Sequence, residues 1–197
     1  MSKDFKRRKR YRQTKKTFLL ICEGSCEEIY FKYMKRNKRL TNINIEILNP
    51  KISIPSGLYK YTKRKQKERQ YDKVFWVLDG DVLKQYDKNP ESRIKSIISN
   101  PCFEVWFVLH YKYTSKEFYS CDNLINLELK RYIPDYEKSQ IYHSKKNFYE
   151  ILKKNLNDAI YNAKKLDKEN KKSGKPKGTS TGIYKIIEEI FQEHSKE

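Results

Sequence analysis

Two uninterrupted apolar segments constrain the fold of this chain more strongly than any other feature of its sequence. Residues 17–22 read Thr-Phe-Leu-Leu-Ile-Cys, and residues 74–78 read Val-Phe-Trp-Val-Leu. Short continuous runs of this kind are typical of strands that are buried on both faces of a parallel sheet. A glycine turn follows the first run, and apolar residues then recur at helical spacing from Ile29 to Met34. The order strand, turn, helix, strand predicts an α/β domain with a mainly parallel sheet flanked by helices.

The remaining elements follow from the same patterns. We expect further strands at 43–48 and 94–98, a short helix or turn opening at Pro90-Glu91, and a loop at 173–178. Predicted helices cover 58–70, 102–111, 121–131, 146–166 and 180–193. The sequence therefore indicates a helical C-terminal part after the α/β region.

Three of the predicted helices carry start signals. Ser25, with Glu28 three residues later, fits a capping box for the first helix. Asn100-Pro101 fits an N-cap followed by proline at the first helical position. Thr179 or Ser180 is placed to cap the last helix.

Length and composition exclude several classes of protein. With 197 residues, of which 37% are hydrophobic, the chain suits one domain with a core. No apolar run is long enough to span a bilayer, and no signal peptide is visible, so we expect a cytoplasmic protein without a membrane partner. Four cysteines are too few for a disulfide scaffold, and the three histidines do not complete a short-spaced zinc pattern. We therefore expect free thiols in a reducing compartment.

The net charge of +19 is concentrated in three stretches, namely 1–16, 60–73 and 164–177. We expect 1–16 to be a flexible basic tail. Clustered Lys and Arg favour a polyanion, and nucleic acid is the usual one, although solvated surface is the alternative explanation. The candidate nucleic-acid-binding residues are Lys63, Arg64, Lys65, Lys67, Arg69, Lys145, Lys146, Lys171 and Lys172.

Acidic residues stand where the two apolar strands end. Glu23 follows the first strand, and Asp79-Gly80-Asp81 closes the second. Functional groups of open α/β sheets collect beyond the carboxyl ends of the strands, so Glu23, Asp79 and Asp81 should converge. Converging carboxylates repel one another, and Mg²⁺ or Mn²⁺ would relieve that repulsion. Asp-Gly-Asp is also an ordinary turn sequence, and an acid at a helix start is favoured by the helix dipole.

These segments resemble a known family. Leu20-Ile-Cys-Glu-Gly24 followed by a helix, then Val77-Leu-Asp-Gly-Asp81, is similar to the Toprim domain of topoisomerases, primases and OLD-type nucleases. Ser99-Asn-Pro-Cys-Phe-Glu-Val-Trp106, and the segment from Thr179 to Ile187, resemble the RloB family, a Toprim-like group linked to restriction and phage-defence loci. The resemblance spans roughly residues 15–192.

The resemblance implies roles for four carboxylates. Glu23 would act as general acid/base or help to hold metal, and Asp79 and Asp81 would be metal ligands. Glu104 would either complete the catalytic site or pair with a lysine or arginine. Two histidines are assigned from the residues themselves: His110 reads as a core histidine, and His143 as a weak candidate for a phosphate contact.

We therefore expect a Toprim-type α/β domain at 17–120 and a helical extension at 121–197 that packs on it. The expected function is Mg²⁺- or Mn²⁺-dependent hydrolysis of DNA or RNA, tRNA included, as an effector of antiviral defence. Topoisomerases and primases need more chain, so water would be the nucleophile. The sequence has no phosphate-binding G-x-x-x-x-G-K-[ST] motif, so an ATPase would be a separate partner. Homo-oligomerisation stays open, and the alternative function is a non-catalytic nucleic-acid-binding or adaptor subunit.

Overall fold

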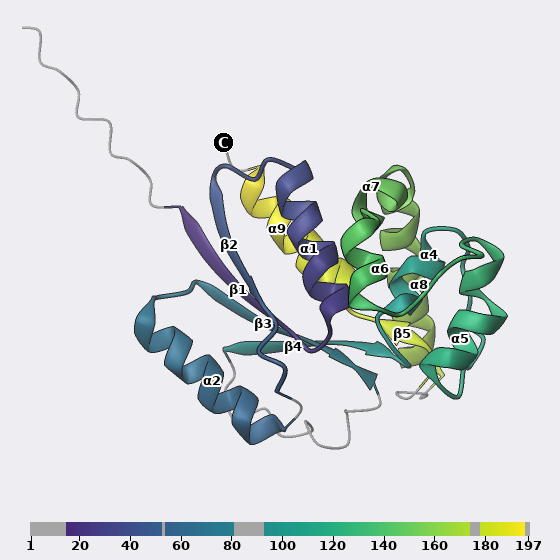
Figure 1. The fold of residues 1–197 in the computed structure, drawn as a ribbon, viewed down its shortest axis with the longest axis horizontal. Helices are drawn as coiled ribbons and strands as arrows, with labels where there is room; N and C mark the ends of the chain where they lie inside the picture. The colour runs from purple at the N-terminus through teal and green to yellow at the C-terminus, as the bar shows by residue number, and fades with distance from the viewer. Residues whose placement is uncertain (1–14, 53, 81–92, 174–177, 196–197) are drawn as a thin grey trace, which may run out of the picture.

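The computed structural model describes residues 15–52, 54–80, 93–173 and 178–195. They form one five-stranded sheet in the order β2-β1-β3-β4-β5 (Figure 1). Neighbouring strands among the first four are parallel, and only β5 is antiparallel. The predicted α/β class and mainly parallel sheet are confirmed. The strands are β1 (Lys16–Cys22), β2 (Ile43–Leu48), β3 (Lys73–Asp79), β4 (Ile94–Asn100) and β5 (Ser180–Thr181).

Helices cover both faces of the sheet. In Figure 1, α1 and α9 lie on one face, α2 lies on the other, and the remaining helices gather beyond β4 and β5. The helical C-terminal part is confirmed, and its apolar side chains join the same core as those of β1, β3 and α1. The helices are α1 (Ser25–Asn37), α2 (Pro55–Glu68), α4 (Glu104–Leu109), α5 (Cys121–Leu127), α6 (Gln140–Lys145), α7 (Phe148–Leu152), α8 (Leu156–Lys172) and α9 (Ile183–His194), with 3-10 turns at Leu129–Arg131 and Lys153–Asn155.

The two faces of β1 explain why its sequence is apolar throughout. Phe18 and Leu20 face the larger core beneath α1 and α9, whereas Leu19 and Ile21 face the smaller core beneath α2. The smaller core also buries Trp76, whose indole Nε1 donates a hydrogen bond to Thr62 Oγ1 of α2 at 2.9 Å. A buried indole N–H without an acceptor would be costly, so this bond helps to fix α2 on the sheet.

Two expected helix starts are wrong. Asn100 is the last residue of β4 and pairs with Ser180 of β5, and its side chain donates to Gly178 O at 3.0 Å. It is therefore unavailable as a cap, and α4 begins only at Glu104. At α1 the cap position is held by Gly24 in an extended conformation, and Glu28 pairs with Lys32 instead.

The start of the last helix also differs from the prediction. Ser180 and Thr181 form β5, so α9 begins at Ile183 after Gly182. Thr181 Oγ1 accepts a hydrogen bond from Ile183 N at 3.3 Å. The expected turn at Pro90-Glu91 and most of the 173–178 loop lie outside the described residues, as does most of the expected tail 1–16. Within the described part of the chain, no helix is both long and apolar enough to cross a membrane.

Candidate functional site

Glu23 and Asp79 meet at the carboxyl ends of β1 and β3. The two strands are neighbours, and Cys22 pairs with Val77, so the residues that follow them emerge at the same edge. Glu23 Oε2 accepts a hydrogen bond from Asp79 N at 3.0 Å, and Glu23 N donates to Val77 O at 3.0 Å. The expected convergence of these two acids is present. The third expected acid, Asp81, lies outside the described residues.

Glu27 is a further acid of this cluster, and its place at a helix start is also favoured by the helix dipole. It lies in the first turn of α1 and is 3% exposed. Burial, and secondarily the charge of Asp79, raises the pKa of Glu27 well above its ordinary value. Its Oε2 atom is buried and has no hydrogen-bond partner among the described residues. An unpartnered buried carboxylate oxygen is costly, and a bound cation would be one way to offset that cost.

The Glu27 carboxylate lies against Gly24, in the turn after β1. A Cβ atom on Gly24 would stand 2.4 Å from Glu27 Oε2. The Glu-Gly pair after β1 therefore does more than make a tight turn. It leaves room for a second carboxylate beside the first.

Asp79 is held from two sides. Its Oδ1 accepts a hydrogen bond from Phe103 N at 2.8 Å, and its Oδ2 lies 3.3 Å from Lys138 Nζ. Burial raises the pKa of Asp79 to about 7, the Lys138 ammonium opposes this rise, and the charges of Glu104 and Glu23 add to it. Near neutral pH this carboxyl is therefore poised between its protonated and ionised forms.

Lys138 bridges Asp79 and Glu104. Its Nζ lies 3.4 Å from Glu104 Oε2, and the Glu104 side chain is fully buried. Burial lowers the pKa of Lys138, but the carboxylates of Glu104, Asp79 and Glu27 outweigh it and hold the pKa above its ordinary value. The ammonium group thus stands where the sequence leads one to expect a metal cation. Of the two alternatives for Glu104, the ion pair with a lysine is the one present.

A buried aromatic residue anchors the other oxygen of Glu104. The Tyr136 hydroxyl lies 2.7 Å from Glu104 Oε1 and 3.1 Å from His143 Nε2. Burial lowers the pKa of His143 to about 4, so this imidazole is neutral at physiological pH. His143 is therefore a buried partner of Tyr136, and the expected phosphate contact is wrong. His110 is a core residue as expected, with Nδ1 at 2.8 Å from Trp106 O.

Two cysteines border the site and form a disulfide, Cys102–Cys121. The expectation of free thiols holds for Cys22 and Cys26, which are buried, but is wrong for this pair. The reason is spatial, because α5 brings Cys121 against the segment between β4 and α4. The Cys102 and Cys121 sulfur atoms and a Glu104 oxygen lie within 4.8 Å of one another. With the disulfide reduced, these atoms would be a partial ligand set for a softer ion such as Zn²⁺.

A family model described as RloB-like protein matches residues 18–190, which is most of the chain. The chain belongs to the RloB-like family. No curated protein and no solved structure matches the sequence. The matched region includes every carboxylate discussed above and Lys138, so the acidic cluster lies within the RloB-like part of the chain.

The candidate nucleic-acid-binding residues of this RloB-like chain do not form one surface. The first five, at 63–69, belong to α2 and the residue after it, on the sheet face opposite α1 (Figure 1). Several are engaged locally: Lys65 pairs with Glu68 at 2.7 Å, and the Arg64 guanidinium lies 5.0 Å from the Tyr61 ring centre. The last of the five, Arg69, is exposed to solvent and forms no ion pair with a described residue.

The other four candidates lie on the helical part. Lys146 pairs with Asp135, and Lys171 pairs with Asp167 at 2.9 Å. Lys145 and Lys172 are exposed. Acidic neighbours therefore neutralise half of this second group, which weakens the case for them as phosphate contacts.

Lys138 and Glu27 are the site residues that sequence reasoning missed. Lys138 stands in Tyr-Glu-Lys between two predicted helices and has no motif around it. For Glu27 a signal existed: it lies four residues after Glu23, one helical turn into α1, so it returns to the strand end.

Proposed function

We propose that this RloB-like protein is a metal-dependent phosphodiester hydrolase of the Toprim type, with its centre at Glu23 and Asp79. One observation carries the proposal. Four acidic side chains gather at the ends of β1 and β3, and burial holds the pKa of two of them, Glu27 and Asp79, above the ordinary value. A fold that keeps acids together at such a cost generally does so for a cation or for proton transfer.

The donor set fits a hard divalent cation. Glu23, Glu27 and Asp79 offer carboxylate oxygens, which Mg²⁺ and Mn²⁺ prefer, and the unpartnered Oε2 of Glu27 provides a place for one more contact. Asp81 would add a fourth carboxylate. A bound divalent ion would polarise the phosphoryl oxygen and assist the attack of water.

The chain's own side chains supply the remaining functions. Asp79, kept in place by Phe103 N, would hold its carboxylate at a fixed point beyond β3. Lys138, 38% exposed, can leave Asp79 and neutralise a substrate phosphate instead. Glu27, buried in the first turn of α1 beside Asp79, would contact the same divalent cation through its unpartnered Oε2.

A cleavage assay tests the proposal. Labelled single-stranded DNA, duplex DNA and tRNA would be incubated with the protein in Mg²⁺ or Mn²⁺, and with Glu23→Gln and Asp79→Asn variants. Asp158→Asn is a matched control, because Asp158 is an exposed acid in the first turn of α8. We expect cleavage by the wild type and the control only. Absence of cleavage of all three substrates by the wild type, with binding intact, would contradict the proposal.

One observation favours a second candidate function. Lys138 already pairs with Asp79 and Glu104, so a built-in cation balances part of the acidic cluster without metal. A non-catalytic nucleic-acid-binding or adaptor subunit could keep such a site as a structural ion pair. The same assay separates the two, because a non-catalytic protein binds nucleic acid unchanged in the Asp79→Asn variant and cleaves none in any form.

The proposed biological setting rests on the family. A role as effector of antiviral defence, with a separate ATPase as partner, accords with membership of the RloB-like family and with the lack of a phosphate-binding G-x-x-x-x-G-K-[ST] motif in this sequence. Co-purification from the native host, followed by identification of the bound proteins, tests it. Recovery of the protein alone would count against an ATPase partner.

A further inference from the structure

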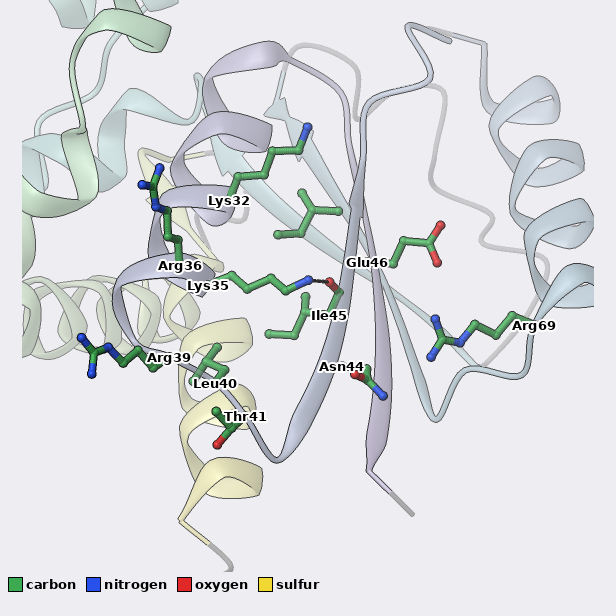
Figure 2. A pocket seen from close by; sticks show the side chains of 11 residues that line it. Lys32, Lys35, Arg36, Arg39, Leu40, Thr41, Asn44, Ile45, Glu46 and Arg69 are labelled. Carbon is green, nitrogen blue, oxygen red and sulfur yellow. Dashed lines mark hydrogen bonds between the residues drawn. The ribbon is translucent and has the colours of Figure 1, made fainter.

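A basic groove runs along the edge of the sheet, away from the residues singled out by the sequence. It lies between α1 and β2, continues around β2 to Arg69, and has a volume of about 670 Å³ (Figure 2). Its described lining residues include Lys32, Lys35, Arg36, Arg39 and Arg69, with Glu46 as the only acid among them. We call it the α1–β2 groove. Four of its cations lie outside the charge-rich stretches at 1–16, 60–73 and 164–177, so the charge count along the chain did not reveal it.

Of the lining cations, Lys32 pairs with Glu28 at 2.6 Å, whereas Glu46 does not neutralise the others. Glu46 accepts a hydrogen bond from the Tyr71 hydroxyl at 2.6 Å and lies 3.9 Å from Lys65, so its carboxylate is engaged on the α2 side of the strand. Figure 2 shows Glu46 and Arg69 on one side of β2 and the cations of α1 on the other. Arg36, Arg39 and Arg69 form no ion pair with any described residue, and all three are exposed.

Protection of the sheet edge explains only part of this charge. β2 is an edge strand, and charged side chains at an edge discourage pairing with another chain. Lys35 serves that purpose directly, since its Nζ donates to Ile45 O at 2.6 Å across the groove (Figure 2). The three arginines make no such bond to the strand. Arg39 has a backbone φ of 47°, in the left-handed region. After the last residue of a helix this conformation is commonly adopted by glycine.

Helix α1 extends from the groove to the acidic cluster. Glu27 lies in the first turn of that helix, and Lys32 and Arg36 follow it by about 8 and 14 Å along the helix axis, at 1.5 Å per residue. A smaller hollow of about 240 Å³ on the same helix is also lined by Lys32 and Arg36, and reaches Ser144 of α6 beside the exposed Lys145. At about 100° per residue, Lys32 and Arg36 stand about 140° and 180° around the helix from the buried Glu27. Phosphates laid along the exposed face of α1 would therefore meet these cations first and reach the carboxylates only beyond the N-terminal end of the helix.

We propose that the α1–β2 groove binds the phosphodiester backbone of a nucleic acid and directs it towards the acidic cluster. This inference rests on the proposed function and adds the path of its substrate. No aromatic residue is among the described residues that line the groove, so the contacts are to phosphates rather than to stacked bases. Binding there should therefore be steeply salt-dependent and indifferent to base sequence.

The test compares two triple variants with equal loss of charge. The groove variant carries Arg36→Gln, Arg39→Gln and Arg69→Gln. The matched control carries Lys130→Gln, Lys154→Gln and Lys168→Gln, which are exposed residues of the helical part without ion pairs among the described residues. Binding of a labelled 20-nucleotide oligothymidine would be followed by fluorescence anisotropy in EDTA from 50 to 200 mM KCl, so that no cleavage interferes. Thermal melts would verify that both variants remain folded.

For single strands each neutralised phosphate contributes about 0.7 to the slope of log K against log salt. Loss of three contacts should therefore make the slope shallower by about 2 and weaken binding about 100-fold at 0.1 M salt. We expect less than about a threefold effect in the control, because nonspecific surface charge contributes little at this salt. Equal losses in both variants, or wild-type binding by the groove variant, would overturn the proposal.

Two further readouts remove ambiguity. Poly-glutamate and unlabelled oligothymidine would be compared as competitors at equal charge. If poly-glutamate displaced the labelled oligonucleotide equally well, the groove would be assigned to an acidic protein, and the proposal would be overturned. The Asp158→Asn variant should bind as the wild type does. Groove-dependent binding without cleavage would support the groove proposal and refute the hydrolase. Cleavage by the wild type, with unchanged binding by the groove variant, would support the hydrolase and refute the groove proposal.

Discussion

Replacing Asp79 with asparagine should stabilise the metal-free protein at alkaline pH. The pKa of this carboxyl is 3.8 in its ordinary state and about 7 in the folded protein, mainly because it is buried. Below about pH 4 the carboxyl is protonated in both the folded and the unfolded chain, and its contribution to stability is complete. As the pH rises from there through about 7, the unfolded chain releases the proton first, so the free energy of unfolding falls. At 1.36 kcal/mol per pKa unit the loss amounts to at most about 4 kcal/mol.

Asparagine removes that loss with little change of shape. Its amide oxygen can still accept the hydrogen bond from Phe103 N, while the buried negative charge is gone. In EDTA at pH 8 we expect the variant to be more stable than the wild type by up to about 4 kcal/mol, and at pH 5 by much less. Urea unfolding followed by circular dichroism at both pH values measures the difference.

The same experiment in Mg²⁺ separates a metal ligand from a merely buried acid. A ligand present at 100 times its dissociation constant stabilises the folded state by about 2.7 kcal/mol, so Mg²⁺ should raise the stability of the wild type and not of Asp79→Asn. Asp158→Asn should behave as the wild type throughout. Equal stability of wild type and Asp79→Asn at pH 8, or a difference that does not depend on pH, would refute this reasoning.

Three other changes have defined outcomes. Lys138→Met leaves the Asp79 and Glu104 carboxylates without their cation. The free energy of unfolding in EDTA at pH 8 should therefore fall, and Mg²⁺ should stabilise the variant more than the wild type. An unchanged response to Mg²⁺ would count against a cation site. Gly80→Ala places a Cβ atom 2.8 Å from Asn100 Cα, and we expect urea unfolding to show a loss of about 1–3 kcal/mol; a loss below 0.5 kcal/mol would mean that the strand ends adjust freely. Alkylation of the denatured, unreduced protein should modify two of the four cysteines by mass spectrometry, because Cys102 and Cys121 are bonded to each other; four modified cysteines would contradict the disulfide.

The sequence was sufficient for the first four strands of the sheet, though not for β5, because the signals of those four are local. Continuous apolar runs such as 17–22 identify strands that are buried on both faces, and both core clusters use alternate residues of that segment. The convergence of Glu23 and Asp79 followed from parallel strand order alone. The local signals were misleading at Asn100, because a long-range pairing with β5 and a contact with Gly178 outweighed its capping preference.

The rest of the site depends on contacts that no local pattern encodes. Lys138 reaches Asp79 across 59 residues of sequence, and the disulfide joins residues 19 apart through the packing of α5. The α1–β2 groove combines Arg69 with residues of α1, so its charge is visible only after folding. Charge counted along the chain instead pointed to 60–73 and 164–177, where ion pairs with Glu68 and Asp167 offset part of it.

The most direct test of the central claim is a crystal structure of the protein soaked with Mn²⁺ at pH 8, with the ion located by its anomalous scattering. The account requires a peak between Glu23 and Asp79, about 2.1 Å from a carboxylate oxygen of Asp79, with Lys138 Nζ moved away from that carboxylate. The absence of a peak, with Lys138 still bridging Asp79 and Glu104, would contradict the claim that these acids form a metal centre.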